Sequence, residues 1–191
     1  MIKTFTGPMH SGKSAAMIEV YREIKDKEHI LCFKPFKDTR DYGVIKSKAY
    51  EDSIPAICIV KFDDILNYIN DNIKTIFIDE IELLEGNMRV LSYLSIMKDI
   101  DIYVAGLNMT SEIEPFLIMP YILAISDEVV NIKARCNDCG RENSASYTYF
   151  NGEKTDAVLV GDAGYVSLCS ECVKKREEKG KKLLFGPSIK K

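Results

Sequence analysis

Eight residues near the start of the chain restrict its possible folds more than any other feature. The segment Gly7-Pro8-Met9-His10-Ser11-Gly12-Lys13-Ser14 matches the GxxxxGK[ST] pattern of phosphate-binding loops at every defined position. An apolar segment (2–6) precedes it, and a segment with apolar residues at helical spacing (13–25) follows it. A strand, a glycine-rich turn and a helix in this order are the context that the pattern requires. A chance match in a tight turn is therefore the weaker interpretation.

This loop is expected to bind the phosphates of ATP. Backbone N–H groups of a glycine-rich turn can point inward at phosphate oxygens, and the N-terminus of the following helix adds partial positive charge. Lys13 should bridge the β- and γ-phosphates, and Ser14 should ligate Mg²⁺. The predicted ATP-binding residues are Gly7, Pro8, Met9, His10, Ser11, Gly12, Lys13 and Ser14.

The rest of the N-terminal part alternates between strand-like and helix-like segments. This alternation predicts an α/β fold with a parallel sheet and helices on both faces. Residues 37–53 are polar and poorly periodic, which indicates an exposed arm or hairpin. The predicted strands are 2–6, 29–33, 57–60, 74–79 and 101–107, and the predicted helices are 13–25, 63–70 and 88–97.

Two acids end one of the predicted strands. The run TIFIDE delivers Asp79 and Glu80 at its carboxyl end, where open α/β sheets bind their ligands. Asp79 can hold Mg²⁺ together with Ser14, and Glu80 can accept a proton from a hydroxyl nucleophile. The alternative is an acidic exit that only caps the next helix. The phosphate loop makes the functional interpretation the stronger one.

Four of the six cysteines form two CxxC pairs, Cys136/Cys139 and Cys169/Cys172. Paired CxxC motifs are typical of structural Zn²⁺ sites, in which four thiolates surround the ion and leave no open position. Free thiols and a redox pair are the alternatives. Cys32 and Cys58 lie in apolar segments and are predicted to be core residues.

Composition divides the chain and limits its partners. We predict a P-loop α/β domain over 1–133, a metal-held domain over 134–178 and a flexible basic tail over 179–191. The net charge of −3 argues against a nucleic-acid partner, and no apolar run reaches membrane-spanning length. No secretory signal is visible at the N-terminus, so a cytoplasmic location without membrane contact is expected.

The chain contains, in this order, GPMHSGKS, Asp38-Thr39-Arg40, IDE at 78–80, Pro115-Phe116 and the two CxxC pairs, with Tyr165 before the second pair. Together these features resemble the zinc-containing thymidine kinases of the cellular and bacterial class. The resemblance runs from Lys3 to about Lys175. It implies a RecA-like domain with a zinc-bound lasso domain, a homotetramer, and transfer of the ATP γ-phosphate to the thymidine 5′-hydroxyl to give dTMP and ADP.

The same resemblance assigns roles to individual residues. Glu80 matches the catalytic base, and Arg40 and Lys13 match groups that stabilise the transferring phosphoryl group. The lasso backbone at 158–162 would bind the thymine edge. The implied substrate-binding residues are Met9, Asp38, Glu82, Phe116, Thr148, Val158, Leu159, Val160, Gly161, Asp162 and Tyr165.

Several positions depart from the family pattern on the side that would recognise the base. Glu82 replaces a glutamine, Leu83 and Ser111 replace aromatic residues, and Phe150 replaces an arginine. These departures leave open another base specificity or a loss of catalysis, and the basic residues from Lys174 to Lys182 leave open a nucleic-acid-dependent ATPase. The three alternatives are a deoxynucleoside kinase with another base specificity, a nucleic-acid-dependent P-loop ATPase with a zinc ribbon, and a nucleotide-binding regulator without catalysis.

Overall fold

The computed structural model describes residues 1–24, 26–47, 52–151 and 164–178. Its centre is a sheet of six strands in the order β5-β2-β6-β7-β1-β8, and every neighbouring pair is parallel. All carboxyl ends therefore meet at one edge. The strands are β1 (Ile2–Gly7), β2 (Ile30–Pro35), β5 (Ile57–Ile59), β6 (Thr75–Ile78), β7 (Asp101–Leu107) and β8 (Glu128–Asn131).

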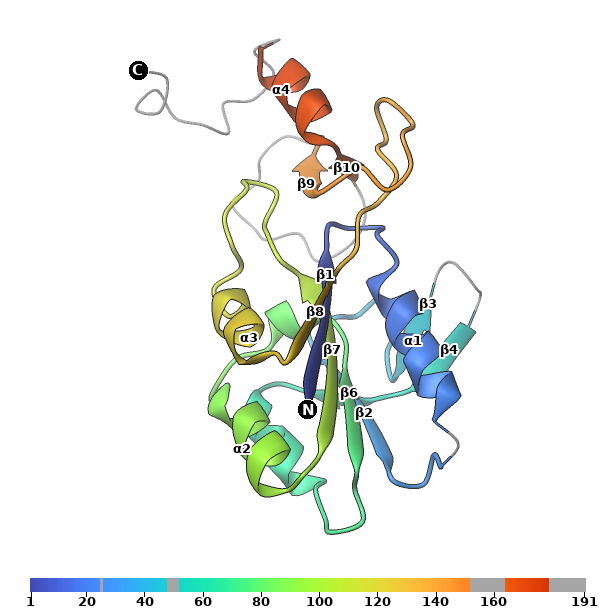
Figure 1. The fold of residues 1–191 in the computed structure, drawn as a ribbon, viewed down its shortest axis with the longest axis vertical. Coiled ribbons are helices and arrows are strands. Elements are labelled where there is room, and N and C mark those ends of the chain that lie inside the picture. The colour runs from blue at the N-terminus through green and yellow to red at the C-terminus, as the bar shows by residue number, and fades with distance from the viewer. Residues whose placement is uncertain (25, 48–51, 152–163, 179–191) are drawn as a thin grey trace.

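Alternating side chains of these strands enter two separate cores. Ile76 and Ile78 of β6 belong to one core, and Phe77 between them belongs to the other. The helices α2 (Arg89–Met97) and α3 (Met119–Ile125) cover the first face, and α1 (Lys13–Glu23) covers the second (Figure 1). Because both faces are covered, β6 is buried throughout. The predicted α/β class, a parallel sheet with helices on both faces, is confirmed and is consistent with a RecA-like arrangement.

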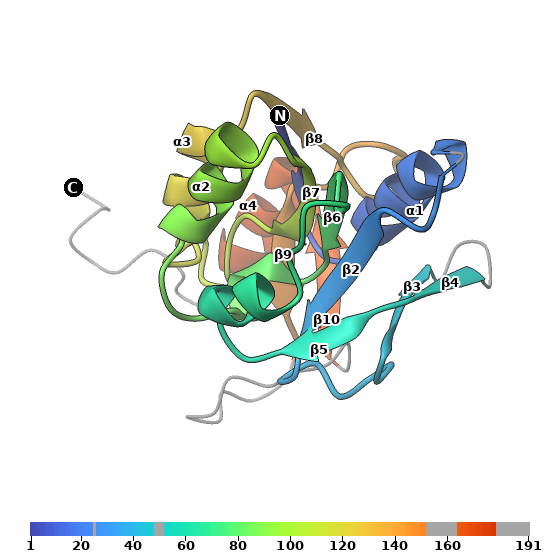
Figure 2. The same cartoon turned by 90° about the horizontal axis from the view of Figure 1, so that it is seen from below.

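Some elements differ from the sequence prediction. The helix predicted over 63–70 is present as a 3-10 helix, η1, which begins at Phe62 and ends at Asn67. The helix α1 ends at Glu23 because Ile24 adopts an extended backbone. The exposed arm or hairpin predicted over 37–53 contains the paired strands β3 (Val44–Ser47) and β4 (Asp52–Pro55), on the α1 side of the sheet (Figure 2). It is less exposed than predicted, because Ile45 is buried in the second core. The elements α3 and β8 were not predicted.

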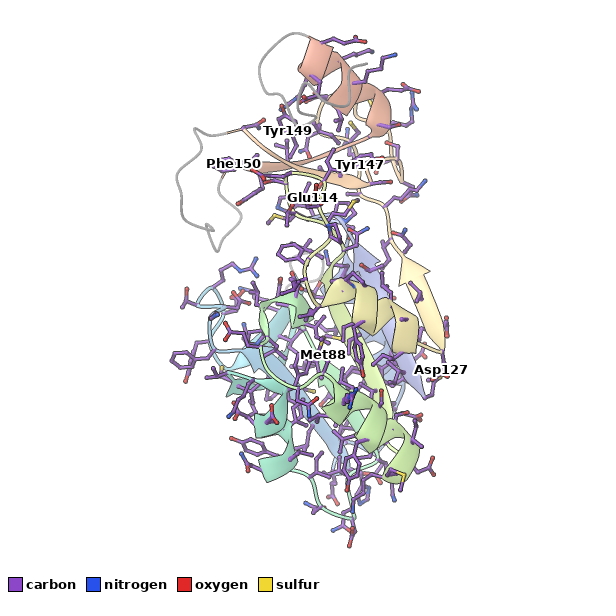
Figure 3. All side chains as sticks on the ribbon, turned by 90° about the vertical axis from the view of Figure 1, so that its left-hand side faces the viewer. Met88, Glu114, Asp127, Tyr147, Tyr149 and Phe150 are labelled. Carbon is purple, nitrogen blue, oxygen red and sulfur yellow. The ribbon has the colours of Figure 1, made fainter. Side chains whose placement is uncertain are left out.

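The cysteine-containing part has its own small core beyond the carboxyl edge of the sheet (Figure 1). It consists of the antiparallel pair β9 (Tyr147–Phe150) and β10 (Tyr165–Leu168), followed by α4 (Ser170–Glu178). Ile113, in the loop that follows β7, packs against this core. Figure 3 shows the neighbouring Glu114 directly below the strand that carries Tyr147, Tyr149 and Phe150. The cysteine-containing part therefore stands over the edge of the sheet where the phosphate loop lies.

None of the helices in the described ranges is long and apolar enough to cross a membrane. The boundaries predicted at 133 and 178 stay predictions, and the tail 179–191 lies outside the described residues.

Candidate active site

The phosphate loop joins β1 to α1 at the carboxyl edge of the sheet. A Cβ atom on Gly7 would lie 2.0 Å from the carbonyl oxygen of Ile132, so the loop can begin here only with glycine. His10 and Gly12 both have positive φ angles, of 58° and 87°. These left-handed residues curl the backbone before α1 begins at Lys13.

Lys13 folds back over this loop. Its Nζ donates a hydrogen bond to the carbonyl oxygen of Pro8 at 2.8 Å. Burial lowers the pKa of the ammonium group, and the carboxylates of Glu80, Glu82 and Asp79 act in the opposite direction. The ammonium group of Lys13 therefore interacts with three acids of the segment 79–82.

Asp79 follows β6 and meets the first turn of α1. The Ser14 hydroxyl donates to its carboxylate, at 2.9 Å from Oδ2 and 3.1 Å from Oδ1. The Asp79 residue is only 7% exposed, and burial, reinforced by the charge of Glu80, raises its pKa to about 7. A hydroxyl and a carboxylate at this separation are the oxygen ligands that Mg²⁺ takes in phosphate-loop proteins.

Glu80 belongs to a series of charged groups that begins at Lys34 in β2, the strand that neighbours β6 in the sheet. Its Oε1 accepts from Arg40 Nη2 at 2.7 Å, and Arg40 Nε donates to Asp38 Oδ1 at 2.7 Å. Lys34, at the end of β2, lies 3.1 Å from Asp38 Oδ2. Burial alone would raise the pKa of Asp38, but Arg40 and Lys34 outweigh it and the pKa is lowered. Glu80 itself has a left-handed backbone with φ of 50°.

These groups face one cavity of about 490 Å³. The structure thus brings the predicted ATP loop, the predicted metal pair and the predicted base to the same space, although their roles stay predictions. The lining residues are Met9, His10, Ser11, Gly12, Lys13, Ser14, Ala15, Lys34, Asp38, Arg40, Asp41, Lys46, Ser47, Asp79, Glu80 and Leu107.

Other predicted substrate residues lie apart from this cavity. Phe116 packs against the core that α2 and α3 cover, and Tyr165 lies against Phe150 with ring centroids 4.8 Å apart. The Thr148 hydroxyl contacts the backbone of Met9. The stretch 158–162, predicted to bind the base edge, lies outside the described residues.

Glu82 is 8% exposed, and neither of its carboxylate oxygens has a hydrogen-bond partner among the described residues. The residue sits in η2 (Ile81–Leu83) against Gly106 of β7, where an added Cβ would lie 2.6 Å from Oε2. Burial, together with the charge of Glu80, raises the pKa of Glu82 well above its ordinary value. A glutamate here is therefore favoured in its neutral form.

Two residues of this region were missed by the sequence analysis. Lys34 is only 3% exposed, and besides Asp38 it contacts the carbonyl oxygens of Asp41 and Val44. A lysine at the end of an apolar strand was the available signal for it. Ser167 is fully buried in β10 and bonds to the phosphate loop, for which the local sequence offered no signal.

The four cysteines form a second site. Their sulfur atoms all lie within 4.8 Å of one another, and Cys139 Sγ is 3.9 Å from Cys169 Sγ. A tetrahedral Zn²⁺ with its usual bond lengths sets sulfur atoms about 3.8 Å apart. Burial would raise the pKa of Cys136, but backbone N–H groups of Cys139, Cys169 and Asp138 lower it to about 6. The donor set fits zinc and could hold it.

A parallel sheet, a glycine-rich loop before α1 and a serine–aspartate pair at the carboxyl edge define a P-loop nucleotide-binding protein. The family model described as thymidine kinase matches residues 1–173. The chain therefore belongs to the thymidine kinase family, as its motifs predicted.

Curated relatives named thymidine kinase align with this chain over most of their length. A thymidine kinase of Pseudothermotoga lettingae is 30% identical over 173 residues, which cover 88% of this chain and 92% of the relative. A thymidine kinase of aster yellows witches'-broom phytoplasma is 33% identical, over 86% of this chain and 81% of the relative. One from Ureaplasma parvum is 29% identical, over 81% and 72%.

Proposed function

We propose that this protein is an ATP-dependent thymidine kinase, which transfers the γ-phosphate of ATP to the thymidine 5′-hydroxyl and yields dTMP and ADP. The observation that carries the proposal is that the Ser14–Asp79 pair and the Glu80–Arg40 pair line the same cavity as the phosphate loop. Membership of the thymidine kinase family and the names of the curated relatives support the substrate.

In this mechanism the loop 7–14 binds the triphosphate through its backbone N–H groups. Ser14 and Asp79 would hold Mg²⁺, which neutralises and orients the β- and γ-phosphate oxygens when bound. Lys13 turns from the Pro8 carbonyl oxygen to the phosphates. This exchange replaces a neutral acceptor with an anionic one, and charge-assisted hydrogen bonds are the stronger kind.

Glu80 acts as the general base for the nucleoside hydroxyl. The hydroxyl oxygen attacks the γ-phosphorus, the bond from that phosphorus to the ADP oxygen breaks, and Glu80 receives the proton. Arg40 stabilises the negative charge on the transferring group and holds Glu80 in place from the side. Asp38 and Lys34 in turn fix Arg40.

The second site is structural in this proposal. Cys136, Cys139, Cys169 and Cys172 would hold Zn²⁺ in a closed coordination shell, which fixes the ends of β10 and α4. The residues proposed to surround the nucleoside are Met9, Asp38, Glu82, Phe116, Thr148, Tyr165 and the stretch 158–162. We extend the proposal to a homotetramer in the cytoplasm. Size-exclusion chromatography with light scattering tests the oligomeric state, and cell fractionation tests the location.

A nucleoside panel tests the function. ADP formation with Mg²⁺ is measured with thymidine, deoxyuridine, deoxycytidine and the purine deoxynucleosides. Thymidine is expected to give the highest kcat/KM. Phosphorylation of another base in preference to thymidine would overturn the assignment of substrate but keep the kinase.

That outcome is the second candidate function, and Glu82 is the observation that favours it. An unpartnered buried carboxyl where the family pattern has an amide changes the chemistry next to the substrate site. ATP turnover that needs DNA instead of a nucleoside would contradict both candidates. Two basic side chains of α4 already have acidic partners, since Arg176 pairs with Asp138 and Lys174 with Glu178.

A further inference from the structure

The backbone of Met9, inside the phosphate loop, is held from both sides by the cysteine domain. Its N–H donates to the Thr148 hydroxyl oxygen at 3.0 Å, and its carbonyl oxygen accepts from the Ser167 hydroxyl. Thr148 and Ser167 face each other across the β9–β10 pair. Both residues are buried, and Ser167 is completely inaccessible to solvent. The hydroxyl groups of Thr148 and Ser167 therefore bind both the N–H and the carbonyl oxygen of Met9.

Ser167 is in turn fixed to the first CxxC pair. Its N–H donates to Asn137 Oδ1 at 2.8 Å, and its carbonyl oxygen accepts from the Asn137 N–H at 2.9 Å. Asn137 follows Cys136 directly. Cys169, two residues after Ser167, directs its own N–H at Cys136 Sγ over 3.4 Å. Hydrogen bonds, joined by short stretches of backbone next to Cys136 and Cys169, thus connect the cysteine cluster to the phosphate loop.

The shape of the loop gives this connection a consequence for binding. Met9 lies between Pro8, whose carbonyl oxygen accepts from Lys13, and His10, which has a left-handed backbone. A non-glycine residue in that conformation costs about 1 kcal/mol or more, so surrounding contacts must hold it. The two hydroxyl groups supply such contacts at the neighbouring residue.

We propose that Ser167, assisted by Thr148, is a positioning residue that fastens the phosphate loop to the cysteine domain, so that nucleotide binding and zinc binding favour each other. The inference rests on the proposed function only through nucleotide binding by the loop. If zinc orders the domain that holds Met9, it removes part of the ordering cost of nucleotide binding. Linkage then requires that nucleotide retain zinc to the same degree.

The first test uses the wild-type protein, in which Thr148 and Ser167 both contact Met9. Zinc-loaded protein is mixed with a chromogenic chelator, and the rate of zinc loss is followed with and without saturating ADP. We expect ADP to slow the loss by about fivefold or more, which is the lower end of typical coupling between two sites. The Lys13→Ala variant in the same ADP concentration is the control for binding of zinc by ADP itself. Equal rates with and without ADP in the wild type would overturn the proposal.

The second test removes the hydroxyl. Ser167→Ala should weaken ADP binding, measured by calorimetry without nucleoside, by about three- to tenfold, as expected for one buried hydrogen bond. Hydrogen exchange of the His10–Gly12 amides should become faster, and ADP should no longer slow zinc loss. Ser144→Ala is the matched control, because it removes a serine hydroxyl bond to Arg141 in the same domain, away from the loop.

Thr148→Val keeps the shape of the side chain and gives a second variant if Ser167→Ala does not fold, and Thr148→Ser should restore the affinity for ADP. ADP affinity unchanged in both hydroxyl-deleting variants would overturn the proposal. Wild-type protein that binds ADP but does not phosphorylate thymidine would refute the proposed function alone. Wild-type protein that binds no ADP would refute both.

Discussion

Arg40 connects two acids that are far apart in sequence, with its Nη2 at 2.7 Å from Glu80 Oε1 and its Nε at 2.7 Å from Asp38 Oδ1. The guanidinium group presents a rigid fork of donors, so this double contact fixes the direction of the Glu80 side chain. Arg40 thus connects Glu80, the proposed proton acceptor, to Asp38 and Lys34, which line the same cavity as the phosphate loop.

Glu80→Gln should abolish most turnover while nucleotide binding persists. An amide keeps an oxygen that can accept from Arg40, but it cannot take the proton of the nucleoside hydroxyl. We expect kcat to fall by about 10²- to 10⁴-fold. The ATP dissociation constant, measured by calorimetry, should stay within about threefold because the loop contacts are intact. Glu85→Gln, at an exposed glutamate paired with Lys37, should keep wild-type turnover. Full activity of the Glu80 variant would remove this residue as the base.

Ser14→Ala should separate Mg²⁺-dependent from Mg²⁺-independent nucleotide binding. Its hydroxyl and Asp79 would hold the ion together, so its loss should weaken MgATP binding by about ten- to a hundredfold, as for hydrogen bonds to charged groups. ADP binding in EDTA should change by less than about twofold, because the backbone of the loop remains. Ser14→Thr keeps the hydroxyl and should restore MgATP binding. A similar loss with and without Mg²⁺ would show that Ser14 acts on loop structure instead.

Glu82→Gln should stabilise the protein increasingly as pH rises. Burial raises the pKa of Glu82 in the folded state, whereas the unfolded chain ionises near pH 4.3. Stability from the neutral carboxyl is therefore complete below that pH and decreases as pH rises toward the folded pKa, by at most about 1.4 kcal/mol per pH unit. The melting temperature of the variant minus that of the wild type should grow between pH 5 and pH 8.

The control for this measurement is Glu19→Gln, at an exposed position of α1, which should show a small difference at every pH. A difference for Glu82→Gln that stays constant or shrinks toward pH 8 would contradict a raised pKa at this site.

Cys136→Ser should release the metal and loosen the second domain. Four thiolates are needed for a closed tetrahedral shell, so the variant should contain much less than the about one Zn²⁺ per chain expected for the wild type. Atomic absorption measures the metal, and hydrogen exchange over β9 and β10 measures the loss of order. Cys58→Ser changes a cysteine outside the cluster and should retain zinc. Equal zinc content in both variants would exclude the four-cysteine site.

Much of the fold was predictable because the relevant signals are local. The phosphate loop, the buried run ending in Asp79 and the CxxC pairs each lie within a few residues of sequence. The apolar periods placed β6, β7 and α2 to within about two residues. The helix α3 was missed because Pro120 interrupts its apolar run, although proline is compatible with the first turn of a helix. The strand β8 was missed because three of its four residues are exposed at the edge of the sheet.

What the sequence determined by itself was the chemistry available: a phosphate-loop motif, a strand that ends in acid and four cysteines in two CxxC pairs. Only the tertiary structure decided which of these groups meet. The Ser14–Asp79 contact spans 65 residues, and the Ser167–Met9 contact spans 158. Such contacts depend on strand order and on the docking of one domain over the sheet edge. Local periodicity carries no information about either, because it reports only which face of an element is apolar.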